Sequence, residues 1–167
     1  MSHVVTVEVK VRSLEGVRRA CRRLGWVFLE GQQTFKWYGQ WVDDSPIPEG
    51  LFAADEIERL RALDPDLRRE ELTRRFGACD HAIRVPGCDY EIGLVRVADE
   101  YHLVYDFFWA GGLDKVLGTP DRPDAVNPFP QAYATEVAIM RAEENGFAWS
   151  ETKLENGNVI LEVETGW

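Results

Sequence analysis

The sequence lacks any apolar segment long enough to cross a membrane. A transmembrane helix needs about 18 consecutive apolar residues, and no such run occurs among the 167 residues. The first residues also lack the basic stretch and apolar core of a secretory leader. Cysteine is scarce, and the three thiols (Cys21, Cys79 and Cys88) are an odd number for a disulfide framework. We therefore expect a cytoplasmic protein with reduced thiols.

The sequence contains few basic residues relative to acidic ones. There are 19 lysines and arginines against 29 aspartates and glutamates, and the net charge is −10. Because phosphate binding requires positive potential at the contact, this balance disfavours nucleic acid as a partner. The local exception is a group of five arginines between Arg12 and Arg23. The favoured interpretation is a solvated helix face. The alternative is docking to RNA or to an acidic partner, with Arg18 and Arg22 as candidate contacts.

Catalytic and metal-binding motifs are also missing. Three histidines occur (His3, His81 and His102), but no serine lies in a nucleophile-elbow context and no phosphate-binding loop pattern is found. Cys79-Asp80-His81, followed by Cys88, contains residue types that bind zinc, but the spacing matches no closed zinc site. We therefore expect neither a metal nor a cofactor.

The first 42 residues predict a strand, a helix and a second strand region. Valines alternate with polar residues over 3–11, which is typical of a half-buried strand. Ser13 is expected to cap a helix that stops at Gly25. A second strand region is then expected from Trp26 to Val42, with aromatic side chains on one side of its later half.

Residues 43–79 differ in composition from the rest, with ten acids and six arginines. Two short helices are expected at 53–63 and 65–76, the second with Asp64 as its N-cap. We predict that 43–79 is a helical insertion on the surface of a single domain that spans residues 1–167.

The second half of the chain alternates strands and loops before a last helix. The predicted elements are strands at 81–85, 90–97 and 101–109, a glycine- and proline-rich loop at 111–123, a helix from Asn127 to Gly146, and a closing hairpin of 147–154 and 159–165. This pattern indicates an α+β fold, with a mostly antiparallel sheet packed against two main helices and a short helical insertion.

The apolar run Tyr101–Trp109 contains a single carboxylate, Asp106. On a strand, Asp106 shares a face with His102. An ionised carboxylate buried without a partner costs several kcal/mol, so Asp106 must be paired, hydrogen-bonded or functional. The favoured interpretation is structural, with a tyrosine, a tryptophan N–H or an arginine such as Arg84 or Arg96 as the donor.

The alternative for Asp106 is chemical. It would act as a general acid or base, assisted by His102 or His81, at the edge of an aromatic pocket. The aromatic residues expected there are Trp37, Trp41, Tyr105 and Trp109. The same side chains are candidates for a surface that binds a protein partner.

Seven short motifs are distributed along the chain on both sides of the insertion. They are Met1-Ser2-His3, Tyr90–Gly93, Glu100–Asp106, Tyr133-Ala134, Asn145–Phe147, Glu155–Gly157 and Gly166-Trp167. With these motifs the chain resembles the hypothetical chloroplast reading frame 35 family, a domain of unknown function from cyanobacteria, red-algal plastids and other bacteria. Members of that family have a much shorter connection in place of residues 43–79.

The resemblance implies a bacterial protein but no activity. The genes of that family are associated with AAA-type ATPases, so it implies such an ATPase as a partner. The chain departs from the family pattern at Glu91, Leu94, His102 and Gly166.

Three functions follow from these observations. We predict a non-enzymatic protein-binding or adaptor domain that works with an AAA-type ATPase. The alternatives are a small enzyme that uses Asp106 as acid or base, and an RNA-contacting module that uses the arginine-rich first helix. The substrate, the partner's identity and the oligomeric state are left open.

Overall fold

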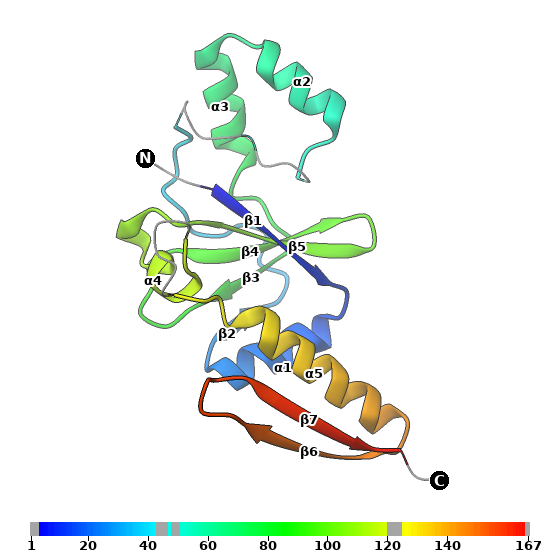
Figure 1. Ribbon diagram of the computed structural model, residues 1–167. Helices are drawn as coiled ribbons and strands as arrows, with labels where there is room; N and C mark the ends of the chain where they lie inside the picture. Colours follow the sequence, from blue (N-terminus) through cyan, green and yellow to red (C-terminus); the bar gives the residue numbers. More distant parts are fainter. Residues whose placement is uncertain (1–3, 43–46, 48–50, 120–124, 166–167) are drawn as a thin grey trace.

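The computed structural model describes residues 4–42, 47, 51–119 and 125–165. Its main feature is a five-stranded antiparallel sheet in the order β1-β5-β4-β3-β2, followed by a separate two-stranded hairpin, β6-β7 (Figure 1). The strands are β1 (Val4–Val11), β2 (Val27–Leu29), β3 (His81–Arg84), β4 (Glu91–Val97), β5 (Glu100–Asp106), β6 (Ala148–Lys153) and β7 (Val159–Glu164). The helices are α1 (Leu14–Leu24), α2 (Ala54–Ala62), α3 (Pro65–Arg75), α4 (Leu113–Leu117) and α5 (Phe129–Glu144), with a 3-10 turn η1 (Trp109–Gly111).

The two main helices, α1 and α5, cover one face of the sheet (Figure 1). They bury apolar side chains against alternate residues of β3, β4 and β5, since side chains on a strand alternate between faces. The buried residues of this layer include Val17, Cys21, Phe129, Ile83, Ile92, Leu94, Leu103 and Tyr105. The predicted α+β fold, a mostly antiparallel sheet packed against two main helices, is confirmed.

Local signals place the ends of α1 as predicted. The Ser13 hydroxyl oxygen accepts the Gly16 N–H over 3.0 Å, and Gly25 ends the helix with φ +71°, a conformation that favours glycine. The phenol oxygen of Tyr133 on α5 accepts two backbone N–H groups just before α1, from Arg12 (2.9 Å) and Ser13 (3.0 Å). These bonds join the start of α1 to α5.

The opposite face of the sheet is covered by α2, α3 and the segment 34–42. The insertion contributes Leu60, Leu72 and Phe76 to a second apolar cluster, together with Val104 of β5. The Phe76 ring is met edge-on by three aromatic rings, those of Phe35, Trp37 and Trp41, at centroid distances of 5.4, 4.6 and 5.5 Å. The helical insertion therefore supplies part of the apolar interior.

The strand predicted from Trp26 to Val42 is wrong beyond Leu29. Residues 35–41 form no strand, although three aromatic side chains lie on one side as expected. Because three of its backbone N–H groups donate to side-chain acceptors, this segment crosses the sheet without pairing in a ladder. The three donations to side chains are Lys36 to Glu91, Tyr38 to Asp106, and Trp41 to Thr73.

Two further differences lie after β5. The strand predicted to reach Trp109 ends at Asp106, and the loop predicted at 111–123 contains α4. A helix of five residues between Gly112 and Gly118 is too short to show an apolar period in sequence. Among the helices in the described part of the chain, none is long and apolar enough to cross a membrane.

Candidate functional site

The Asp106 carboxylate is fully buried at the end of β5. Its Oδ1 accepts the Phe108 N–H over 2.9 Å, and its Oδ2 accepts the Tyr38 N–H over 3.2 Å. Bonds from N–H groups to a carboxylate are stronger than neutral ones, so they offset part of the cost of burying the charge. Both carboxylate oxygens therefore hold backbone in place, through the main-chain amides of Phe108 and Tyr38.

The backbone held by Asp106 carries a group of aromatic rings in which Tyr38 and Trp109 are exposed and Phe108 is half-buried. The rings of Tyr38 and Phe108 meet at 5.5 Å, and those of Phe108 and Trp109 also at 5.5 Å. Trp109 is 71% exposed and Tyr38 48% exposed. We name Tyr38, Phe108 and Trp109 the aromatic surface. The buried Asp106 carboxylate accepts backbone N–H groups from the segments that carry these residues.

The turn that carries Trp109 is also fixed from the other side. The Gly111 carbonyl oxygen accepts the N–H groups of Asp89 (2.9 Å) and Tyr90 (3.3 Å). The Tyr90 ring packs so closely on Gly111 that an added Cβ would lie 2.0 Å from its Cδ2 atom. The exposed Trp109 therefore lies on backbone that is anchored by Asp106 on one side and by the residues just before β4 on the other.

The other predicted aromatic residues do not belong to this surface. Trp41 and Tyr105 are buried, in the clusters on opposite faces of the sheet. Trp37 is half-buried against Phe76. Of the four, only Trp109 is largely exposed. Tyr38 was not assigned to the aromatic surface from the sequence. Its position was a usable signal, because Tyr38 lies on the opposite side of the segment from the aromatic residues at 35, 37 and 41.

The two histidines proposed as assistants of Asp106 have partners elsewhere. His81 Nδ1 accepts the Gly31 N–H over 2.9 Å, and its ring packs between those of Phe28 and Tyr101. His102 Nε2 lies 3.3 Å from a carboxylate oxygen of Glu100. His102 and Asp106 share a strand face, but four residues separate them by about 13 Å. The structure therefore does not assemble these groups into an acid–base pair.

A second buried carboxylate is Glu91 on β4, which the sequence indicated only as a departure from the family pattern and not as a candidate site residue. Its oxygens accept the side-chain amide of Gln32 (2.9 Å), the Lys36 N–H (3.1 Å) and the Arg84 guanidinium (3.3 Å). The presence of a glutamate in an otherwise apolar predicted strand could have indicated a buried carboxylate. Glu91 and Asp106 act alike, because each accepts backbone N–H groups from the segment that crosses the sheet.

The arginines of α1 are mostly ion-paired. Arg18, Arg19 and Arg23 each contact two carboxylates, and the partners are Glu15 and Glu30, Glu15 and Glu143, and Glu136 and Glu151, respectively. Arg22 has no ion pair within the described residues. An RNA-binding face requires arginines that are free of acids, and three of these four are not.

The ion pair of Arg23 with Glu151 joins α1 to β6 and predicts a pH-dependent stability. Hydrogen bonds from Arg23 lower the pKa of Glu151 below its ordinary value of 4.5. A carboxyl group with a lowered folded-state pKa adds stability above its unfolded pKa and loses it as the pH falls through the folded one. We expect Glu151→Gln to reduce the unfolding free energy by about 0.5–1 kcal/mol at about pH 6, and by a smaller amount at about pH 3, which lies below the unfolded-state pKa.

Urea denaturation of the wild type and Glu151→Gln at both pH values measures this difference. Glu155→Gln, in the turn after β6, is the control and should change little at either pH. A loss of equal size at both pH values would contradict the ion-pair explanation.

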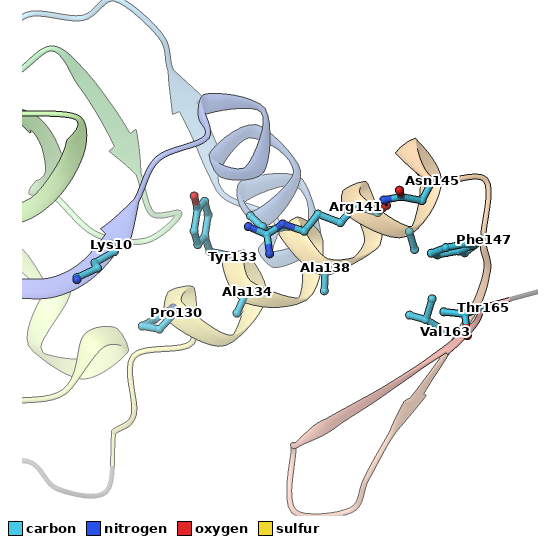
Figure 2. Close-up of a pocket in the computed structure, with 12 residues that line it drawn as sticks. Lys10, Pro130, Tyr133, Ala134, Ala138, Arg141, Asn145, Phe147, Val163 and Thr165 are labelled. Atoms are coloured by element: carbon cyan, nitrogen blue, oxygen red, sulfur yellow. The ribbon is translucent and has the colours of Figure 1, made fainter.

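A groove of about 580 Å³ lies between α5 and the β6-β7 hairpin. Figure 2 shows Pro130, Ala134 and Ala138 along one side of α5, and Phe147, Val163 and Thr165 at the base of the hairpin. Two cations contribute to the lining, Lys10 of β1 and Arg141 of α5. The groove is a second concave surface that sequence reasoning did not anticipate.

The thiols show no sign of reactivity or metal binding. Burial raises the pKa of Cys21 and of Cys79 to about 12, and it also raises the pKa of Cys88. All three cysteines are free. Over residues 4–42, 47, 51–119 and 125–165, no group of three histidine, cysteine or acidic side chains is arranged to hold a metal ion.

Comparison of the chain with protein-family models, with curated proteins and with solved structures found no match. The likeness to the hypothetical chloroplast reading frame 35 family therefore rests on the short sequence motifs alone.

Proposed function

We propose that this chain is a non-enzymatic protein-binding or adaptor domain that contacts its partner through the aromatic surface. The observation that carries the proposal is the 71% exposure of Trp109, on backbone anchored to Asp106 and to the amides of Asp89 and Tyr90. Tryptophan and tyrosine are enriched among the residues that contribute most to binding energy at protein interfaces.

The fixed backbone adds to this argument. Binding through a loop costs free energy when the loop must be ordered on contact. Here the amides of Tyr38 and Phe108 are already held by Asp106. Little backbone conformational entropy is then lost when a partner covers the rings. More of the free energy gained by burying apolar surface therefore contributes to affinity.

The partner that we propose is an AAA-type ATPase. Its support is the resemblance to the hypothetical chloroplast reading frame 35 family, whose genes are associated with such ATPases. The enzyme alternative has less support because both oxygens of Asp106 accept backbone amides. The RNA alternative retains only Arg22 as an unpaired arginine within the described part of α1.

Affinity capture with the tagged protein from a lysate of its own host tests the proposal. We expect the wild type to retain an AAA-type ATPase in stoichiometric amount, and Trp109→Ala to weaken the measured affinity about 30-fold, as for a central interface residue. Trp109→Ala should change the unfolding free energy by less than about 0.5 kcal/mol, because the side chain is exposed.

Trp149→Ala is the matched control. Trp149 is also partly exposed, but it lies on β6, and its removal should leave the capture unchanged. Equal capture by Trp109→Ala and the wild type would contradict the proposed surface. A wild-type sample that retains no stoichiometric protein would contradict the adaptor function itself.

A further inference from the structure

The groove between α5 and the β6-β7 hairpin is separate from the aromatic surface and is mostly apolar. Its described lining consists largely of alanine, valine, proline and aromatic side chains. Val163, which lines it, is 39% exposed, and Ala134 is also exposed. Exposed apolar surface that lines a concavity is typical of a binding site and not of ordinary protein surface.

The side of α5 that lines the groove indicates what kind of partner segment can bind there. Pro130, Ala134 and Ala138 follow one another at intervals of four residues along α5, so they form one row on the accessible side of the helix, and the buried Ala142 lies one step further along. The accessible row is about 12 Å long at the rise of an α-helix. Because these side chains are small, the backbone of a second helix can approach closely and pack its own ridge along the row.

The charge of the groove is opposite to that of the protein. The chain carries 29 acidic and 19 basic residues, yet the described residues that line the groove include two cations, Lys10 and Arg141, and no carboxylate. Neither cation has an ion pair within the described residues. Figure 2 shows the Arg141 side chain extended back along α5 toward Tyr133, and Lys10 beyond the Pro130 end. Both charges thus flank the apolar row.

We infer that this groove binds an acidic amphipathic helix of a partner protein. The apolar side of that helix lies on the alanine row, and its glutamate or aspartate side chains face Lys10 and Arg141. A helix that presents one apolar face to a groove is a common mode of recognition, and the flanking cations select acidic helices over basic ones. This binding is distinct from that of the aromatic surface and does not depend on it.

The probe for the test is a fluorescein-labelled peptide of about 18 residues, with leucines at helical spacing and glutamates elsewhere. A second peptide carries lysine in place of every glutamate. Fluorescence anisotropy with the full chain is expected to show binding of the glutamate peptide below about 1 mM, and binding at least about tenfold weaker for the lysine peptide. High salt should weaken the binding of the glutamate peptide.

Four variants localise the binding. Ala134→Glu places a carboxylate on the floor and should weaken binding of the glutamate peptide about tenfold, and Arg141→Glu about fivefold. Gln131→Glu, on the same helix but outside the groove lining, adds the same charge and should change the affinity less than about twofold. Trp109→Ala should have no effect, which separates this site from the proposed aromatic surface.

Three results would overturn the inference. They are no binding of the glutamate peptide up to about 1 mM, equal or tighter binding of the lysine peptide, and equal weakening by Ala134→Glu and Gln131→Glu. Analytical ultracentrifugation of the protein without peptide gives a fourth test. A concentration-dependent dimer that Ala134→Glu abolishes would assign the groove to a second copy of this chain, whereas a wild type that stays monomeric supports the inferred partner.

Discussion

Asp106→Ala is expected to lower the free energy of unfolding by about 3 kcal/mol. The substitution removes the acceptor for two amides, those of Tyr38 and Phe108. A buried donor left without an acceptor costs about 1–3 kcal/mol, and the cavity left by the carboxylate adds to this loss. Urea denaturation followed by circular dichroism measures the change. Tryptophan emission should report a change around Trp109 as well, since its backbone loses an anchor.

Two other substitutions show whether the loss comes from the buried acceptor. Asp106→Asn keeps one carbonyl oxygen and should lose about half as much stability as Asp106→Ala. Asp80→Ala is the matched control, because the exposed Asp80 carboxylate also accepts a backbone amide, that of Arg96 at 2.7 Å, and its loss should cost less than about 1 kcal/mol. If Asp106→Ala were as stable as the wild type, the structural role of Asp106 would be wrong, and a chemical role would regain support.

Gly93→Ala is expected to destabilise the protein by about 2–3 kcal/mol. Gly93 lies in the middle of β4, under the segment that crosses the sheet, and an added Cβ would sit 2.4 Å from Cδ1 of the buried Phe35 ring. Overpacking of this kind costs about 1–3 kcal/mol. Replacing glycine with alanine in a strand otherwise stabilises the fold by restricting the unfolded chain. The predicted sign therefore depends on the contact with Phe35, and thermal or urea denaturation measures it.

A double-mutant cycle tests whether that contact is the cause. Phe35→Leu alone should cost about 1 kcal/mol through the loss of aromatic packing, but the smaller side chain makes room for a Cβ at Gly93. The double variant should then be at least about 1 kcal/mol more stable than the sum of the two single effects predicts. Additive losses would show that Gly93 is needed for another reason.

The sequence was a good guide wherever a structural choice depends on nearby residues. The Ser13 cap and the Gly25 stop bound α1 as predicted. Asp64 and Pro65 likewise begin α3, since the Asp64 side chain accepts the Asp66 N–H. The closing hairpin also forms around its Asn156-Gly157 turn. Caps and turns satisfy the backbone within a few residues, so their chemistry can be read locally.

The candidate site was only partly accessible in this way. The burial cost of a carboxylate indicated that Asp106 must have hydrogen-bond donors, and the structure describes two. The Phe108 donor lies only two residues away, but the sequence could not identify the Tyr38 donor, because that residue is 68 positions away and donates through its backbone. For the same reason the aromatic pocket was predicted with Trp41 and Tyr105, which are buried, and without Tyr38 and Phe108.

By itself, the sequence determined the α+β class, the order of the main elements and the caps of α1 and α3. Only the tertiary structure decided that residues 35–41 cross the sheet instead of joining it, that Trp109 stands outside, and that a groove with Lys10 and Arg141 forms beside α5. Periodicity and caps depend on contacts within about one helical turn. The accepting carboxylates, the packed aromatic rings and the groove depend on residues that lie far apart in the chain and meet only when the layers of the fold assemble.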